Sequence, residues 1–397
     1  MKLAERMARI GTETAFEAAA RARALEATGR SVIHLEIGEP DFDTPANIRE
    51  AAKRALDRGA THYTPTPGIP ELRAAIAADS TARKGFEVTP DRVVVVPGGK
   101  PVMFFAILAL VNEGDEVIYP DPGFPIYESM VNYVGGKAVA CPIRQENSFR
   151  LDPKELASLV TERTKLVIIN SPANPTGGVS TREDLEQIAA VAREHDLVVL
   201  ADEIYGRTLY EGEHVSIASL PGMAERTIVL DGFSKTYAMT GWRLGYAIVP
   251  EPLVTPFSRL IVNSVSCTNA ATQWAGVEAL TGPQDAVDAM VAEFKARREL
   301  IVDGLNAIPG ITCLRPSGAF YVFPDISATG LTGAELADRL LNEAGVSALA
   351  GTAFGHVGVN HLRFSYANSR ENIAEAMRRT RTVVEPLVEA RRGAAVS

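Results

Sequence analysis

One lysine and one arginine, eight residues apart in the sequence, mark the stretch of this chain best suited to chemistry. Lys235 lies just past a short apolar run, and Arg243 follows among Gly, Ser and Thr residues that let a ligand approach the backbone. A lysine that leaves a buried strand can lose hydration, which lowers its pKa and makes its neutral amine available to attack a carbonyl carbon. An arginine can hold a phosphate through paired, charge-assisted hydrogen bonds. Together the two residues suit a cofactor that carries an aldehyde and a phosphate.

The segment that contains both residues, Asp231 to Arg243, resembles the cofactor-lysine signature of class I and II aminotransferases. These are enzymes of pyridoxal phosphate with the aspartate aminotransferase fold. Further segments resemble other parts of that family in the expected order: Gly38–Phe42, Tyr63–Gly68, Asn174–Gly177, Ala201–Tyr205 and His361–Tyr366. Within the family, the chain resembles the bacterial aspartate/prephenate aminotransferases of the gamma subgroup.

The resemblance implies a role for each matching residue. Lys235 is expected to be the catalytic residue that bonds to the cofactor's aldehyde and later moves a proton. The other expected cofactor contacts are Gly99, Lys100, Phe124, Asn174, Asp202, Tyr205, Ser234 and Arg243, with Tyr63 reaching across from a second copy of the chain. The expected substrate contacts are Gly38, Lys100, Asn174 and Arg363. No metal is expected.

Several of these residues make physical sense in their roles, although each also has an ordinary structural explanation. Asp202 ends an apolar strand, where a cationic partner such as a protonated cofactor ring would offset the cost of burying its charge. An acidic residue in that position can instead cap a helix or form a turn. Arg363 alternates with apolar neighbours in a predicted strand and suits binding of a carboxylate, or an ion pair within the protein. Asn174-Pro175-Thr176-Gly177 alone is a good turn.

The turn Gly98-Gly99-Lys100 joins a predicted strand to a predicted helix, where free backbone N–H groups can bind an anion. It is not a nucleotide-binding Walker A loop, because that loop needs four residues between its glycines and a Ser or Thr after its lysine. Pro101 follows Lys100 here.

Composition indicates a globular enzyme of two domains. The chain has 397 residues, which exceeds one ordinary domain, and 46% of them are hydrophobic. A net charge of −9 argues against nucleic acid as a partner. Three cysteines without CxxC spacing favour neither a disulfide framework nor a zinc site. The charged N-terminus does not resemble a secretory signal, and the longest apolar run, Val102 to Val111, is about half of what a bilayer requires. We therefore expect a cytoplasmic protein without a membrane partner.

The order of apolar segments predicts an α/β fold. Seven β-branched runs alternate with amphipathic helices, which is typical of a mostly parallel sheet covered by helices on both faces. The predicted strands are Arg92–Val96, Glu116–Tyr119, Ala138–Pro142, Lys165–Asn170, Leu197–Ala201, Thr227–Leu230 and Leu244–Val249. We expect a large cofactor-binding domain over residues 46–280. In the resembled fold, residues 1–45 and 281–397 form a smaller α+β domain, and two copies form a homodimer with shared active sites.

Two helix starts are readable from the sequence. Thr44 is expected to cap a helix with Pro45 in its first position, with Leu56 on the apolar face. Ser180 and Glu183 are expected to form a capping box for a later helix.

The predicted reaction is transfer of an amino group from an L-amino acid to a 2-oxo acid, and resemblance suggests 2-oxoglutarate as the acceptor. Lys100 could bind the distal carboxylate of an acidic substrate, while Glu13 could repel it. Aspartate, aromatic and aliphatic donors therefore all stay open. A carbon–sulfur β-lyase or an aminocyclopropane-carboxylate synthase-like enzyme is the alternative, because fold and cofactor do not determine the reaction. A DNA-binding regulator built on the same body would need an extra basic segment.

Overall fold

A seven-stranded sheet forms the centre of the computed structural model, which describes residues 1–396. Its strand order is β2-β8-β7-β6-β5-β3-β4, and only β8 runs antiparallel to its neighbours. The strands are β2 (Val93–Val96), β3 (Glu116–Asp121), β4 (Lys137–Pro142), β5 (Thr164–Asn170), β6 (Val198–Asp202), β7 (Thr227–Gly232) and β8 (Gly245–Ile248). The predicted mostly parallel sheet is confirmed.

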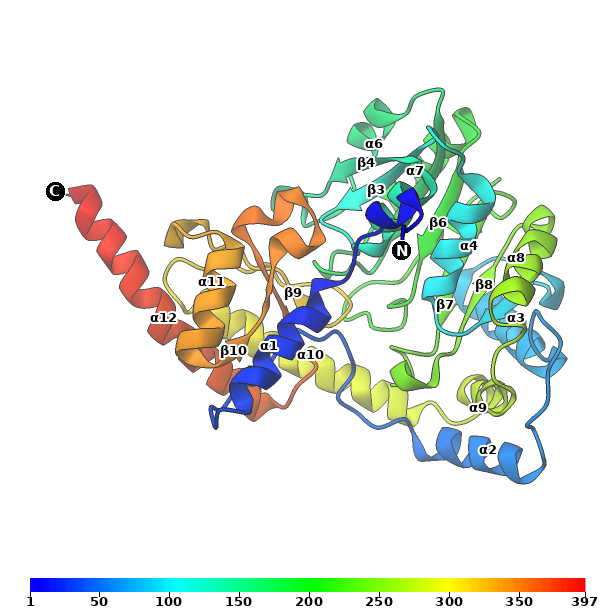
Figure 1. Ribbon diagram of the computed structural model, residues 1–397, viewed down its shortest axis with the longest axis horizontal. Coiled ribbons are helices and arrows are strands. Elements are labelled where there is room, and N and C mark those ends of the chain that lie inside the picture. Colours follow the sequence, from blue (N-terminus) through cyan, green and yellow to red (C-terminus); the bar gives the residue numbers. More distant parts are fainter. Residues whose placement is uncertain (397) are drawn as a thin grey trace.

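Helices cover both faces of this sheet, because successive strand residues point to opposite sides and both sets are apolar. One face packs against α4 (Lys100–Leu110), α5 (Ile126–Val134) and α8 (Glu251–Ser264). The other face packs against α3 (Pro70–Lys84), α6 (Pro153–Leu159), α7 (Arg182–Glu194) and α9 (Ala270–Thr281), and α2 (Ala46–Asp57) lies on α9. The result is the predicted α/β layering (Figure 1).

Segments from both ends of the chain meet beside this sheet. β1 (Ile33–His34) pairs in parallel with β10 (Val346–Ser347), while β11 (Leu349–Ala350), β12 (Leu362–Ser365) and β9 (Tyr321–Val322) form an antiparallel sheet. The helices of this part are α1 (Thr14–Glu26), α10 (Asp285–Asn306), α11 (Gly333–Arg339) and α12 (Arg370–Val396). In Figure 1 the yellow helix α10 extends from this part toward α9 and α2.

Both predicted helix starts need correction. The helix α2 begins at Ala46 with Pro45 as its N-cap residue, and the hydroxyl of Thr44 instead donates to the carbonyl oxygen of Ala238 at 2.6 Å. Leu56 is 53% exposed rather than part of the buried face. The capping box of α7 is formed by Thr181 and Asp184, one residue later than predicted, because only these two reach each other's backbone N–H groups.

The parallel strands β3, β5, β6 and β7 all end at one edge of the sheet, which is where ligands bind in open α/β sheets. Four predicted site residues lie at this edge: Asp202 is the last residue of β6, and the loops after β3, β5 and β7 carry Phe124, Asn174 and Lys235. Over residues 1–396, no helix is both long and apolar enough to span a membrane.

Candidate active site

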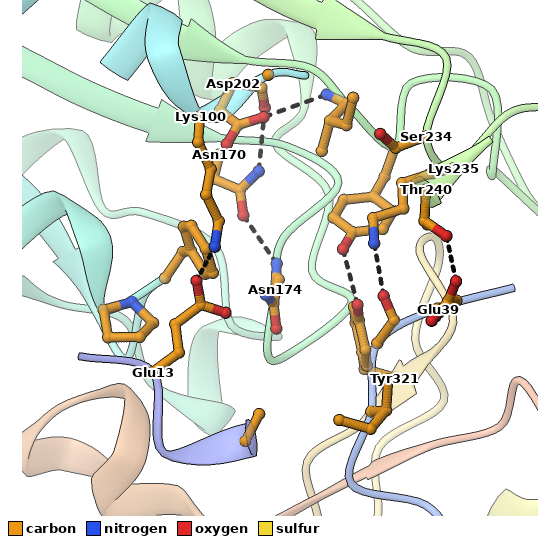
Figure 2. Close-up of a pocket in the computed structure, with 18 of the residues that line it drawn as sticks. Glu13, Glu39, Lys100, Asn170, Asn174, Asp202, Ser234, Lys235, Thr240 and Tyr321 are labelled. Atoms are coloured by element: carbon orange, nitrogen blue, oxygen red, sulfur yellow. Dashed lines mark hydrogen bonds and ion pairs between the residues drawn. The ribbon is translucent and has the colours of Figure 1, made fainter. Parts of the chain in front are cut away.

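A cavity of about 530 Å³ lies at this sheet edge, between the large sheet and the antiparallel sheet. Of the predicted site residues, all but Tyr63 line it: Gly38, Gly99, Lys100, Phe124, Asn174, Asp202, Tyr205, Ser234, Lys235, Arg243 and Arg363. They come from segments spread over most of the chain, so the fold brings together what the sequence separates. Figure 2 shows several of these side chains converging on one space.

Lys235 follows the end of β7 and projects into the cavity (Figure 2). Its Nζ donates to the carbonyl oxygen of Gly38 at 2.5 Å. Loss of hydration lowers the pKa of Lys235 to about 8, and the nearby Arg363 guanidinium adds to this lowering, while Glu39 opposes it. A larger share of neutral amine is therefore available near neutral pH than for an ordinary lysine.

Asp202 is the last residue of β6 and is 5% exposed. Its carboxylate accepts hydrogen bonds from the hydroxyl of Tyr127 at 2.7 Å and from the backbone N–H of Ile204 at 3.2 Å. Burial raises the pKa of Asp202 to about 6. These neutral donors fix the carboxylate without neutralising its charge, so a cationic group entering the cavity would find a ready partner.

Asn174 and Tyr205 are buried on the loops after β5 and β6. The backbone N–H of Asn174 donates to the side chain of Asn170 at 2.8 Å, which in turn donates to the carbonyl oxygen of Asp202 at 3.0 Å. The Tyr205 hydroxyl lies 2.7 Å from the Tyr321 hydroxyl. These bonds join the two loops and the antiparallel sheet into one rigid wall.

Arg243, Ser234 and the start of α4 line one part of the cavity. Arg243 adopts a left-handed backbone conformation, with φ of 55°, and its Nη1 donates to the carbonyl oxygen of Thr240 at 2.7 Å. Gly98 leaves room for this arginine, since a Cβ there would lie 2.1 Å from Nη2. Gly99 is the N-cap residue of α4, so free backbone N–H groups face the same region.

Arg363 lies on β12 and is 3% exposed. Its Nη1 donates to the side-chain oxygen of Asn174 at 3.1 Å, and its Nη2 donates to the carbonyl oxygen of Glu36. The Nε is buried and, within residues 1–396, has no hydrogen-bond partner. A guanidinium has five N–H donors and the described chain uses two of them, so both Nη atoms still carry a hydrogen that could bind an anionic ligand.

Lys100 forms an ion pair with Glu13, and both residues line the cavity (Figure 2). The Lys100 side chain is 42% exposed, and its Nζ lies 5.5 Å from the ring centre of Phe124. Lys100, which was expected to attract an acidic substrate, and Glu13, which was expected to repel it, thus bind each other. Apolar side chains of Met103, Leu349 and Phe354 also line the cavity.

Tyr63 does not line this cavity and is 88% exposed. Its expected role depends on a second copy of the chain and stays a prediction.

The sequence did not single out Tyr127, Asn170 or Tyr321, which hold predicted site residues in place. Tyr127 lies three residues after Phe124, which the resemblance did identify, so its position was a usable signal. Nothing local distinguishes Tyr321 from an ordinary core tyrosine, because its partner Tyr205 lies far away in the sequence.

The arrangement fits pyridoxal 5′-phosphate on its own features. A lysine with a lowered pKa, a buried carboxylate held by neutral donors, and an arginine beside a glycine and a helix start lie on one cavity wall. They would accept the aldehyde, the ring nitrogen and the phosphate of the cofactor, respectively.

Comparisons with known proteins agree with this geometry. A sequence model of the family "Aminotransferase class I and II" matches residues 30–379. The aspartate aminotransferase of Pyrococcus abyssi is 45% identical over 89% of this chain and 92% of its own length. The aspartate/prephenate aminotransferase of Thermus thermophilus is 42% identical over 91% of this chain and 93% of its own length.

A solved structure gives the same answer. The aspartate aminotransferase from Thermus thermophilus with maleate superposes with a TM-score of 0.92 and 40% identity, covering 96% of this chain and 100% of that chain. The chain therefore belongs to the class I and II aminotransferases and is an amino acid aminotransferase that uses pyridoxal 5′-phosphate.

Proposed function

We propose that Lys235, Asp202 and Arg363 carry the transamination, at the cavity where the ends of β6, β7 and β12 converge. The single observation that supports this most strongly is the convergence itself. Three groups of different chemistry, an amine, a carboxylate and a guanidinium, lie on the wall of one cavity of about 530 Å³. When bound, the cofactor takes the electrons of a broken Cα bond into its ring.

Lys235 would anchor the cofactor through its amine and then, once displaced by the amino donor, carry the proton between substrate and cofactor. The pKa of about 8 suits both tasks, because a general acid or base works best when its pKa lies near the working pH. Asp202 would keep the ring nitrogen protonated. Arg243, Ser234 and the start of α4 would hold the phosphate.

Arg363 would bind the α-carboxylate of the substrate. Its guanidinium is fixed by Asn174 and by the backbone of Glu36, and it lies 4.6 Å from the ring centre of Tyr321. A fixed, planar guanidinium orients a carboxylate through two hydrogen bonds, which would place the Cα atom near Lys235. Gly38 leaves space at this point, since a Cβ there would lie 2.1 Å from the Tyr321 hydroxyl.

The substrate side chain would face the Glu13 and Lys100 pair and the apolar wall of Met103, Leu349 and Phe354. An acidic side chain must compete with Glu13 for the Lys100 ammonium, whereas an aromatic or aliphatic one can contact the apolar wall directly. We propose 2-oxoglutarate as the common amino acceptor and a donor range that extends beyond aspartate.

We propose that the working enzyme is a cytoplasmic homodimer in which Tyr63 of one copy reaches the phosphate end of the other copy's cavity. The high exposure of the Tyr63 side chain supports a contact with a second copy of the chain. We also keep the proposed division into residues 46–280 and the two flanking segments. Mixing Lys235→Ala protein with Tyr63→Ala protein should regenerate one intact site per hybrid dimer, and activity no higher than that of either variant alone would contradict the shared site.

The reaction is tested with a panel of L-amino acids, measured with and without 2-oxoglutarate. We expect formation of glutamate and of the matching 2-oxo acid only when the acceptor is present. Release of pyruvate from L-cysteine conjugates without any acceptor would instead show lyase chemistry as the main activity.

A further inference from the structure

A buried ion cluster lies behind the cavity, on the opposite side of the ends of β6 and β7. At its centre is Lys84, the last residue of α3, which is only 4% exposed. Its Nζ lies 2.7 Å from Oε2 of Glu203 and 2.8 Å from Oδ2 of Asp231. A buried ammonium shared by two carboxylates is costly to assemble, so a role beyond packing is worth seeking.

The sheet register connects this cluster to the cavity. Asp202 of β6 pairs with Leu230 of β7, and both line the cavity. Because successive residues of an extended chain point to opposite faces, the residue after each of these, Glu203 just past β6 and Asp231 of β7, points away from it. Glu203 directly follows Asp202, and Asp231 lies four residues before Lys235. Lys84 thus ties together the two strand ends that carry the proposed ring-nitrogen partner and the proposed catalytic lysine.

Donors reach every oxygen of these two carboxylates. Ser216 donates to Oε1 of Glu203 at 2.5 Å, and Lys84 donates to its Oε2 at 2.7 Å. The backbone N–H of Gly232 donates to Oδ1 of Asp231 at 2.7 Å, and the Tyr246 hydroxyl of β8 donates to Oδ2 at 3.1 Å. The cluster is therefore held in one arrangement, and it fixes the positions of the ends of β6 and β7.

The charge of the cluster also acts on the cavity. Lys84 balances one of the two carboxylates, so the region behind Asp202 carries a smaller negative charge than Glu203 and Asp231 would give alone. Both of these carboxylates oppose ionisation of Asp202 and raise its pKa, as does burial, the larger cause. Arg83 also interacts with Asp231, but its guanidinium forms an ion pair with Asp79 on the same helix, which balances its charge.

We propose that Lys84 is a positioning residue of the cofactor site: by binding Glu203 and Asp231 behind the sheet, it holds Asp202 and Lys235 in register and sets the charge that the cofactor meets. This inference rests on the proposed function of Asp202 and Lys235. Lys84 itself touches neither cofactor nor substrate.

Opposite charge changes in the cluster test the proposal. The variants are Asp231→Asn, Lys84→Met and the double variant Lys84→Met/Asp231→Asn, which removes one charge of each sign. Asp91→Asn, a carboxylate that is 97% exposed, is the matched control. For each protein loaded with pyridoxal 5′-phosphate, two quantities are measured: the pH midpoint of the absorption change that accompanies proton loss at the bound cofactor, and the dissociation constant of the cofactor. Thermal unfolding shows which variants are folded.

Removing a negative charge should ease proton loss, and removing a positive charge should hinder it. Asp231→Asn should therefore lower the midpoint and Lys84→Met should raise it, each by about one pH unit, which is what a unit charge about 10 Å away produces at an effective dielectric constant of about 20. The double variant should return to within about 0.3 pH units of the wild type, because the charges again balance. Cofactor affinity should fall by roughly ten-fold in Lys84→Met and recover in the double variant.

A purely structural role would change stability without moving the midpoints in opposite directions. A midpoint in Asp231→Asn that matches the wild type would overturn the proposal, even if Lys84→Met does not fold, and so would a double variant whose midpoint stays as far from the wild type as that of Asp231→Asn. A wild-type protein that carries the cofactor on a residue other than Lys235 would overturn the proposed function, and this inference with it.

Discussion

Two lysines on opposite sides of the same sheet edge are perturbed in opposite directions. Lys235 faces the cavity, where desolvation lowers its pKa to about 8; Glu39 and Glu13 oppose this lowering, while Arg363 and Lys100 add to it. Lys84 lies behind the edge, where desolvation also acts, but the carboxylates of Asp231 and Glu203 outweigh it and raise its pKa. Loss of water is common to both sites. At Lys235 desolvation prevails because neighbouring cations and carboxylates act in opposite directions, whereas at Lys84 the two carboxylates outweigh desolvation.

The difference has a physical consequence for how each lysine is used. An amine that attacks a carbonyl must lose its proton near neutral pH, so cations nearby are useful to it. An ammonium that binds two buried carboxylates must keep its proton, so its neighbours must be anions. The proposed catalytic lysine and the proposed supporting lysine therefore lie on opposite sides of one sheet. The consecutive residues Asp202 and Glu203 face those two sides.

Removing the reactive amine should have the largest effect. Lys235→Ala should lower the transamination rate by at least roughly 10⁴-fold, because both the anchor and the proton carrier are lost. Lys165→Ala is the matched control, since this exposed lysine lies on β5 of the same sheet. A Lys235→Ala protein with turnover close to that of the control would contradict the assigned role.

Removing the supporting ammonium should act mainly on stability. Lys84→Met should lower the free energy of unfolding by about 3–5 kcal/mol, because two buried carboxylates lose their shared partner. Lys53→Met, at an ion pair exposed on α2, should have a much smaller effect, because exposed ion pairs contribute little to stability. Denaturant titration measures the free energy of unfolding of both variants. An equal decrease in the two would show that the buried Lys84 cluster contributes no more to stability than an exposed ion pair.

The residues that line the cavity could be identified from the sequence, but the Lys84 cluster behind the sheet could not. Lys235, Asp202 and Arg363 belong to recognisable segments, and strand ends of a parallel sheet meet at one edge, so their convergence was predictable. Lys84 lies 147 residues from Asp231 and 119 from Glu203, and no local pattern marks a helix-terminal lysine as buried. Its role depends on how α3 packs under the sheet, which only the folded structure shows.

The errors in the helix starts have a similar origin. Thr44 has the residue type of a cap, yet its hydroxyl bonds to Ala238 and accepts from the indole N–H of Trp242 at 2.9 Å, both distant in sequence. Ser180 and Thr181 both have side chains that can cap a helix, but the Thr181 hydroxyl accepts from the Asp184 backbone N–H, while the Ser180 backbone N–H donates to the Ser171 hydroxyl. Tertiary contacts outweighed the local capping preference of Thr44. For the later helix, they favoured Thr181 over its neighbour Ser180.

The acidity of Asp202 gives a test that needs no activity. In cofactor-free protein, its raised pKa of about 6 means that the folded state keeps a proton that the unfolded chain releases from about pH 4 upward. The free energy of unfolding should therefore fall as the pH rises from about 4 to 6, by up to about 3 kcal/mol. Asp202→Asn should remove this part of the pH dependence. Curves of equal slope for both proteins would contradict the raised pKa.

The smallest expected effect concerns the outer wall of the cavity. Glu13→Gln frees the Lys100 ammonium and should improve acidic donors relative to aromatic ones by a few-fold, since a partly exposed ion pair is worth about 1 kcal/mol. Lys100→Ala should weaken acidic donors more than aromatic or aliphatic ones. The ratio of kcat/KM values for aspartate and phenylalanine measures both, and equal changes for the two donors would remove the assigned role in specificity.

The central claim is that the amine of Lys235, and not that of Lys84 or Lys100, carries the cofactor. Protein loaded with pyridoxal 5′-phosphate is treated with borohydride, which fixes the cofactor to the lysine that holds it, and is then mapped by peptide mass spectrometry. We predict that the added mass lies on the peptide containing Lys235. A modified peptide containing a different lysine, with Lys235 unmodified, would contradict the account.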